Sequence, residues 1–225
     1  LSAIIGKQDA PKQRTALTAT ELGAFLPALS SIPRQYALAI RLMLLTGVRV
    51  GTLSEARTDE FDTEAGLWRI PHERRKNRRH TTGAFEVPLP ALAVEWVREL
   101  LKLADRSEYL LPVESRRHSD ARNPMSKRTT IGDWLDRMEG CGNDWRRITP
   151  HDLRSTCKSW LSELRVDYET RQRYLDHALE GMDAVYDKAD FISHRLAAAE
   201  KWLGFLSDIE AGKESATVIE LQNAA

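Results

Sequence analysis

The chain has 225 residues, of which 42% are hydrophobic and 29% are charged, and its formal net charge is zero at pH 7. A chain of this length and composition buries roughly 70% of its unfolded surface, so a globular fold needs neither disulfides nor a structural metal. The apolar stretch 36–47 is too short to span a bilayer, no signal-peptide pattern is present, and Cys141 and Cys157 lack metal-ligand spacing. Composition thus argues against a membrane-spanning protein and favours reduced thiols in a cytoplasmic one.

The zero net charge conceals an uneven distribution along the chain. Segments 69–79, 114–128 and 146–158 have formal net charges of +5, +3 and +3, so the remainder of the chain carries −11. One basic segment is most often a solvated face, whereas three that meet on one surface form a footprint for a phosphate backbone. Nucleic acid is therefore a candidate partner.

The first quarter of the chain has the pattern of helices. Residues 1–14 lack periodicity and are expected to form a linker. Thr18 and Glu21 have capping-box spacing, and apolar residues recur at helical spacing between 22 and 29. Pro33 suits the first turn of a second helix, which Gly47 would end, and 51–57 is predicted as a short third helix.

The period then changes to that of strands and returns to that of helices. Residues 67–73 and 85–90 alternate as strands, 60–66 predict a strand and a turn, and the basic segment 74–84 connects the two later strands. Helices are predicted at 90–105, 126–140, 149–164, 168–177, about 179–187 and 190–211, with a loop at 107–125 and a tail at 212–225. The predicted fold class is α+β, mainly α-helical with a small antiparallel β-sheet.

The stretch "TPHDLR" at 149–154 places His151 and Arg154 about one turn apart at a helix start, with Thr149 as cap and Pro150 in the first turn. Taken alone, it reads most simply as the polar edge of an amphipathic helix. A metal phosphohydrolase site would need further clusters of His and Asp. The six histidines show no such grouping, so we expect no metal and no other cofactor.

Three other stretches have the same two interpretations. Arg49 in "TGVR" follows a helix-ending glycine, Lys76 stands in the basic connection between two strands, and His177 in "LDH" precedes Tyr186 by nine residues. Each alone is consistent with an ordinary structural role: an arginine that caps the C-terminal end of a helix, a solvated hairpin, or a tyrosine at the edge of the core. Their order along the chain is more informative than any one of them.

Together, the sequence resembles the tyrosine recombinase (phage integrase) family over roughly residues 15–205. The matching positions are Arg49, Lys76, His151, Arg154, His177 and Tyr186, and "IPHERRKNRRH" and "AAEKWLGFL" look closest to integrases of genomic islands and prophages. The resemblance implies the catalytic-domain fold of that family over 15–211. It also implies site-specific DNA recombination, in the integration or excision of a mobile element, through a 3′-phosphotyrosyl intermediate, without metal or ATP.

The chemistry of phosphodiester cleavage explains why these residue types suit the reaction. A tyrosine hydroxyl has a pKa near 10, so it becomes a useful nucleophile only beside positive charge and a base. Planar guanidinium groups match the negative charge that spreads over the non-bridging oxygens. The resemblance therefore implies that Arg49 and Arg154 bind the phosphate and that Tyr186 attacks. The remaining implied roles are general acid for Lys76, proton acceptor or phosphate donor for His151, and hydrogen-bond donor to the phosphate for His177.

Three departures from the family pattern affect these expectations. Thr52 stands where a Glu is frequent, so Glu55 or a backbone group is expected to support Arg49. Asp176 stands where Gly is frequent before the histidine, and we expect its carboxylate to contact His177 or the backbone. The connection around Lys76 is longer than in many relatives. All six catalytic positions are present, which favours an active enzyme.

The resemblance also implies partners and cellular location. Arg74, Arg75, Arg78 and Arg79 are predicted to contact the backbone of double-stranded DNA, and accessory DNA-bending proteins are possible partners. We expect a homotetramer on DNA, weak association or a monomer without it, and no membrane partner. The location would be the bacterial cytoplasm, at the nucleoid when bound. DNA-binding domains commonly precede this domain in the family, so we expect a piece of a longer protein, and "SATVIELQ" near the C-terminus is predicted to dock on a neighbouring subunit.

Two alternative functions remain open at this point. A type IB topoisomerase-like enzyme would use the same tyrosine chemistry to relax supercoils without site specificity. A non-catalytic DNA-binding regulator could share the scaffold, and the loss of a catalytic position would have indicated it.

Overall fold

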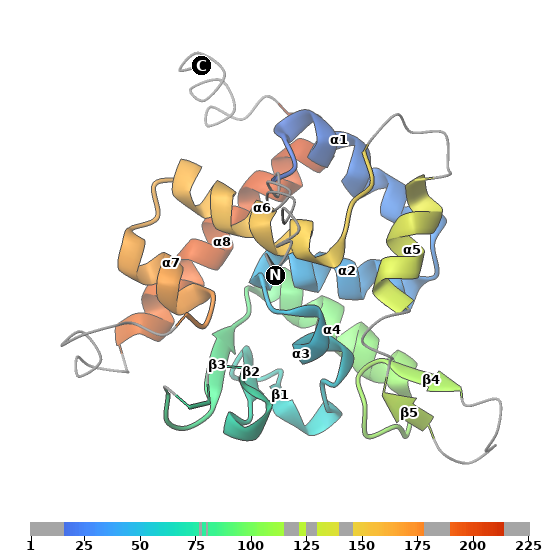
Figure 1. Cartoon of the computed structure of the whole chain (residues 1–225), viewed down its shortest axis with the longest axis vertical. Coiled ribbons are helices and arrows are strands. Elements are labelled where there is room, and N and C mark those ends of the chain that lie inside the picture. Colours follow the sequence, from blue (N-terminus) through green and yellow to red (C-terminus); the bar gives the residue numbers. More distant parts are fainter. Residues whose placement is uncertain are drawn as a thin grey trace, which may run out of the picture.

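The structure is a computed structural model, and it describes residues 16–76, 78–79, 81–114, 122–124, 130–139, 146–177 and 190–213. The helices are α1 (Ala19–Ala28), α2 (Arg34–Thr46), α3 (Val50–Ser54), α4 (Ala91–Ala104), α5 (Thr130–Glu139), α6 (Pro150–Glu163), α7 (Tyr168–Tyr174) and α8 (Asp190–Glu210). The strands are β1 (Phe61–Asp62), β2 (Leu67–Ile70), β3 (Phe85–Pro88), β4 (Pro112–Glu114) and β5 (Arg122–Pro124), and short 3-10 helices occupy Leu29–Ser31, Thr58–Glu60 and His72–Arg74. The expected mainly helical α+β fold is confirmed (Figure 1).

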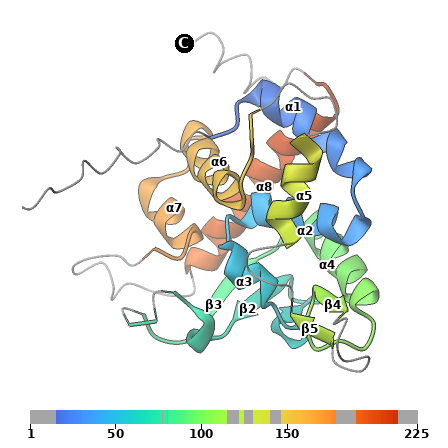
Figure 2. The ribbon, with the colours of Figure 1, turned by 45° about the vertical axis from the view of Figure 1, so that its right-hand side comes forward.

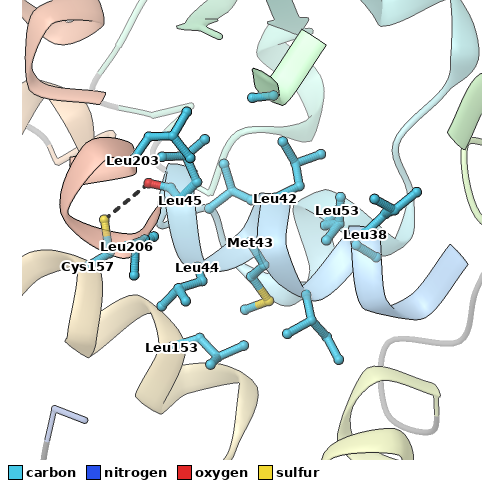
Figure 3. Packing of buried hydrophobic residues seen from close by; sticks show 14 of the residues in the cluster. Leu38, Leu42, Met43, Leu44, Leu45, Leu53, Leu153, Cys157, Leu203 and Leu206 are labelled. Carbon is cyan, nitrogen blue, oxygen red and sulfur yellow. Dashed lines mark hydrogen bonds between the residues drawn. The ribbon is translucent and has the colours of Figure 1, made fainter. Parts of the chain in front are cut away.

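Helix α2 forms the centre of the fold because it is apolar on nearly all sides. Its residues from Ala37 to Ile40 and from Leu42 to Thr46 are buried, and it packs against α4, α5, α6 and α8. Figure 3 shows Leu42, Leu44 and Leu45 among side chains of the helices around it. A helix that is hydrophobic all round belongs in a core, which is where the fold places it.

The buried end of α2 would leave backbone carbonyls without partners unless other elements supplied donors. Trp202 Nε1 donates to the carbonyl of Leu44 at 3.1 Å, and Tyr174 Oη donates to that of Leu45 at 2.8 Å. The Cys157 thiol also points to the Leu45 carbonyl, at 3.4 Å (Figure 3), and its burial raises its pKa to about 12. Helices α6, α7 and α8 are thereby joined to the end of α2.

The sheets lie at one end of the molecule, as both ribbon views show (Figures 1 and 2). The three-stranded sheet has the order β1-β2-β3 and is antiparallel, with Leu67 opposite Pro88 and Ile70 opposite Phe85. Along β2, Trp68 and Ile70 are buried while Arg69 is exposed, which is the alternation that predicted this strand. Strand β3 packs against α8, so the sheet is covered by the last helix.

Most predicted elements are present, but several of their boundaries differ; the helix expected at 51–57, for example, ends at Ser54, and the strand expected at 85–90 ends at Pro88. The strand expected at 67–73 ends at Ile70, where Pro71 and a 3-10 turn follow, and the helix expected at 168–177 ends at Tyr174. The loop expected at 107–125 contains the antiparallel pair β4–β5. Those strands escaped prediction because each has only three residues and includes a proline, which gives no alternating pattern.

Other predictions fall outside the described residues: the linker at 1–14, the helix at about 179–187 and most of the tail at 212–225. Across the residues that the structure does describe, no helix combines the length and the apolar character needed to cross a membrane.

Candidate active site

Four segments that are far apart in the sequence meet at the C-terminal end of α2. They are the turn after α2, the first half of α6, the turn after α7 and the hairpin between β2 and β3. Val48, Arg49, Arg75, Phe85, Arg154 and Asp176 all line one open depression between these segments. Three of the four polar residues in this set are arginines, so the depression has a positive wall.

Gly47 sets the direction in which the chain leaves α2. Its φ of 62° lies in the left-handed region that favours glycine, and its amide donates to the carbonyl of Met43 at 2.9 Å. A Cβ at this position would lie 2.7 Å from Leu175 Cδ2 and 3.1 Å from Cys157 Sγ. The glycine therefore ends the helix and also allows α6 and the turn after α7 to approach, and Arg49 follows as the N-cap of α3.

Arg154 connects three of the segments through one guanidinium group. Its Nη1 donates to the carbonyl of Gly47, and its Nη2 donates to the carbonyl of Leu175 at 2.7 Å. The residue is only 8% exposed, although it was predicted from the polar edge of a helix. Thr149 caps α6, as expected, and it forms a capping box with Asp152 that fixes the start of the helix and so orients this side chain.

His177 is held in one tautomer by its two neighbours. Arg154 Nη2 lies 3.2 Å from Nε2 of the ring, and because arginine can only donate, Nε2 is the acceptor. The proton then sits on Nδ1, which donates to Oε1 of Gln172 at 2.6 Å. Burial, followed by the charges of Arg154, Lys158 and Arg49, lowers the pKa of His177, so the neutral ring is favoured.

Arg49 contributes a second guanidinium to the site. Its Nη1 lies 4.0 Å from Oδ2 of Asp176, and its side chain is 28% exposed, more than that of Arg154. Burial and then the positive charge of Arg49 lower the pKa of Arg154 to about 10. Arg154 still keeps its charge at neutral pH, and an anion bound between the two guanidinium groups would offset the repulsion between them.

Lys76 follows Arg75 in the hairpin and is exposed. The hairpin is held by His72, whose Nε2 lies 2.8 Å from the carbonyl of Thr81 and 3.0 Å from that of Arg78. Carbonyls accept, so Nε2 carries the proton and donates to both. Sequence reasoning missed this role for His72, because no local pattern shows that its ring reaches across the hairpin.

The remaining predicted catalytic residues are placed as follows. His151 is exposed in the first turn of α6, one turn before Arg154. Tyr186 lies outside the described residues. The structure thus brings Arg49, Arg154 and His177 together, leaves His151 and Lys76 exposed on two separate elements, and does not describe Tyr186.

The four arginines predicted to contact DNA fall into two pairs. Arg74 donates to the Glu60 carboxylate and to the carbonyl of Thr52, and Arg75 is 8% exposed and pairs with Asp176, so both are engaged within the protein. Arg78 and Arg79 are exposed at the tip of the hairpin. Contact of all four with DNA stays a prediction.

Asp176 makes a contact that the sequence did not indicate. Its Oδ1 accepts from Nη2 of Arg75 at 2.6 Å. Its partners come from the hairpin and from the turn after α2, more than 100 positions away in the sequence, which is why no local pattern indicated them. Gln172, which orients His177, was also missed. It is only five positions away, but a glutamine on a short helix gives no distinctive sequence signal.

The described residues offer no group of three or more His, Cys, Asp or Glu side chains that could hold a metal ion. The depression is lined by Arg49, Arg75 and Arg154 together with Asp176, and guanidinium groups are suited to binding an anion.

Comparison with known proteins identifies the family. The chain is 28% identical over 189 residues to tyrosine recombinase XerA of Thermococcus kodakarensis, covering 83% of this chain and 62% of XerA. The structure is similar to the integrase of mycobacterium phage Brujita, with a TM-score of 0.61, 17% identity, and coverage of 92% of this chain and 67% of that chain. It is also similar to the lambda integrase in a tetramer bound to a Holliday junction, with a TM-score of 0.54, 25% identity, and coverage of 80% and 51%.

These likenesses agree on the fold, and this chain spans 62% of the length of XerA, so it corresponds to one part of that relative. The model of the phage integrase family matches residues 15–191, more than three quarters of the chain. The matched range contains every catalytic position predicted from the sequence. The chain therefore belongs to the phage integrase family.

Proposed function

We propose that this chain is the catalytic domain, over about residues 15–211, of a site-specific DNA recombinase of a mobile element. It would cleave and rejoin DNA strands through a 3′-phosphotyrosyl intermediate. The observation that supports the proposal most directly is the meeting of Arg49 and Arg154 at one depression, with His177 against Arg154, in a member of this family. Two guanidinium groups, one of them buried, suit a phosphodiester better than any neutral substrate.

In the proposed reaction, the Tyr186 oxygen attacks the scissile phosphorus while the bond from phosphorus to O5′ breaks. His151 accepts the tyrosine proton, and Lys76 donates a proton to the leaving O5′. Arg49 and Arg154 neutralise the charge on the non-bridging oxygens, an effect that in comparable oxyanion sites is worth about 10²–10³-fold in rate per donor. The phosphotyrosyl bond conserves the energy of the cleaved bond, so rejoining needs neither ATP nor a metal.

His177 would change its hydrogen bonding when the phosphate binds. In the structure its Nε2 accepts from Arg154, so it cannot donate there. A phosphate brings negative charge next to the ring, which raises the pKa of His177 and favours a proton on Nε2. The protonated nitrogen would then donate to a non-bridging oxygen, while Gln172 keeps the ring oriented.

Double-stranded DNA is the proposed partner, and a tetramer on DNA is the proposed assembly. The lambda integrase, 25% identical to this chain, has been solved as a tetramer bound to a Holliday junction. We propose weak association without DNA, docking of the segment 215–222 on a neighbouring subunit, and possible accessory DNA-bending proteins. The reaction would take place in the bacterial cytoplasm, at the nucleoid.

The decisive experiment is covalent capture on nicked duplex DNA. A library of nicked duplexes with a randomised centre is incubated with the chain and with Tyr186→Phe, and protein–DNA adducts are resolved under denaturing conditions. The nick lets the short 5′-hydroxyl fragment diffuse away, so the adduct accumulates. We expect an adduct with the wild type, none with Tyr186→Phe, and an enriched sequence in the recovered DNA.

The matched control is Tyr168→Phe, which removes the hydroxyl of a tyrosine that is 67% exposed on α7. It should form the adduct as the wild type does. An adduct with Tyr186→Phe would reject Tyr186 as nucleophile. Adducts without an enriched sequence, together with relaxation of unrelated supercoiled plasmid, would instead indicate a topoisomerase-like enzyme.

A further inference from the structure

The side chain of Asp176 connects two arginines that come from different parts of the fold. Its Oδ1 accepts from Arg75 Nη2 at 2.6 Å, and its Oδ2 lies 4.0 Å from Arg49 Nη1. The Asp176 and Arg75 side chains are 11% and 8% exposed, so their ion pair is largely shielded from water. A shielded, charge-assisted contact of this length holds its two partners far more firmly than a surface pair does.

The backbone at this position makes the aspartate notable. Asp176 has a φ of 51°, in the left-handed region where glycine carries no penalty and most other residues do. Aspartate tolerates that region better than most, and here its carboxylate gains a buried partner that glycine could not offer. The side chain, rather than the backbone, therefore gives this residue its role.

Arg75 extends the connection into the hairpin. Its Nη1 donates to the carbonyl of Gly83 at 2.9 Å, and its guanidinium lies 5.6 Å from the centre of the Phe85 ring at the start of β3. Arg75, which belongs to the outgoing arm, thus contacts the returning arm and Asp176 at once. The next residue is Lys76, so the hairpin is attached to the His177 turn one residue away from the proposed general acid.

We propose that Asp176 is a positioning residue: through its pair with Arg75 it holds the β2–β3 hairpin so that Lys76 reaches the leaving O5′. The inference rests on the function proposed above, because it assigns Lys76 a proton to donate. Catalysis loses about 10²-fold when a reacting group is misplaced by about 1 Å, and this sets the size of the expected effect. In this role the pair acts on Lys76 through the hairpin rather than on the reacting atoms themselves.

The test compares two leaving groups in single-turnover cleavage. One nicked duplex has the ordinary O5′, whose departure needs a proton; the other has sulfur in its place, and a thiolate departs without one. We expect Asp176→Asn and Arg75→Gln each to slow cleavage of the oxygen substrate by about 10²-fold, and to cleave the sulfur substrate within a few-fold of wild type. The double variant should be no slower than either single variant.

Three controls make the comparison specific. Asp176→Gly removes the carboxylate while easing the backbone, so it should behave as Asp176→Asn does if the charge is what matters. Asp105→Asn changes another aspartate with positive φ, 53°, at the exposed end of α4, and should cleave both substrates at the wild-type rate. Lys76→Ala removes the proposed general acid, so it shows the largest decrease in cleavage rate to be expected. That decrease should occur with the oxygen substrate and not with the sulfur substrate.

A second readout needs no DNA. The amides of Arg75 and Arg78 donate to the carbonyls of His72 and Arg75, so their hydrogen exchange reports whether the hairpin is held. Exchange should be faster in Asp176→Asn than in the wild type, and unchanged in Asp105→Asn. If no adduct forms with either substrate, the proposed function fails. Hydrogen exchange then still shows whether Asp176 holds the hairpin in place.

Several outcomes would overturn the proposal. Cleavage of the oxygen substrate by Asp176→Asn at or above the wild-type rate would show that the carboxylate is dispensable, or that it competes with the phosphate for Arg49. Equal slowing on oxygen and sulfur would indicate a general structural role. Unchanged exchange in the hairpin would remove the physical basis of the idea.

Discussion

Arg154 illustrates how one side chain serves both the fold and the site. Its guanidinium donates hydrogen bonds to the buried carbonyls of Gly47 and Leu175. The same group also lies against the ring of His177. Because the group is 8% exposed, a lysine would not replace it: a single ammonium cannot span acceptors on two segments in one plane. These hydrogen bonds hold the Arg154 guanidinium in one orientation. That orientation would also fix the side from which it could bind a phosphate.

The protonation of His177 should make stability depend on pH. Burial and neighbouring positive charges lower its pKa in the folded protein, whereas the unfolded chain takes up a proton near the ordinary value of about 6.5. The unfolded state then binds more protons as the pH falls below about 6.5, so the stability that is present above that pH is lost on acidification. We expect the urea midpoint to fall more between pH 7.5 and 5.5 in the wild type than in His177→Gln.

His194→Gln, which removes an exposed histidine on α8, is the matched control and should keep the pH dependence of the wild type. Equal pH dependence in His177→Gln and the wild type would contradict the assignment of a neutral His177.

At the scale of elements, the site is built from helix ends. Helix α2 stops at Gly47, α3 begins after Arg49, α6 starts with its capping box before Arg154, and α7 ends just before the turn with His177. Helix ends place side chains on short turns between rigid bodies, so their geometry depends on packing between helices rather than on one segment. We therefore expect a small change at one of these turns to shift several of the site residues together.

Gly47→Ala tests this dependence. The substitution forces a Cβ into the left-handed region and to within 2.7 Å of Leu175, so we expect a loss of about 1–3 kcal/mol in the free energy of unfolding, measured by urea denaturation. Gly132→Ala in α5 is the control: a Cβ there meets nothing within 4 Å, and alanine favours a helix by about 0.5–1 kcal/mol. A Gly47→Ala protein as stable as wild type would mean that the turn can relax.

At the scale of the whole molecule, the uneven charge distribution bears on DNA binding. If the chain neutralises about six phosphates, the logarithm of its DNA affinity should fall with the logarithm of salt concentration at a slope near −5. The structure divides the hairpin arginines: Arg78 and Arg79 are exposed, whereas Arg74 is paired with Glu60, whose carboxylate also accepts from Trp68.

We therefore expect the double variant Arg78→Gln/Arg79→Gln to make the slope shallower by about two, as measured by fluorescence anisotropy at several salt concentrations. Arg74→Gln should leave the slope near that of the wild type and lower the stability instead, because Glu60 would lose its buried partner. A slope near zero for the wild type would reject the phosphate footprint, and a change of slope with Arg74→Gln would show that DNA displaces Glu60.

Sequence reasoning succeeded where a signal is local. The capping box at Thr18, the cap at Thr149 and the end of α2 at Gly47 follow from residues within one turn of each other, and all three are confirmed. It failed where strands are short, as in β4–β5, and where contacts join distant segments, as between Asp176 and Arg75. Sequence proximity says little about the direction of a side chain in the left-handed region, so the neighbours of Asp176 in the sequence did not indicate Arg75 as its partner.

By itself, the sequence determined the fold class, the family resemblance and the order of Arg49, Lys76, His151, Arg154 and His177 along the chain, since residue type and spacing encode these. Only the tertiary structure decided which of these groups meet, which tautomer His177 adopts, and which arginines are engaged inside the protein. The physical reason is that helix periodicity and capping act over a few residues. The charge, burial and partners of a side chain, in contrast, depend on segments that only the folded chain brings together.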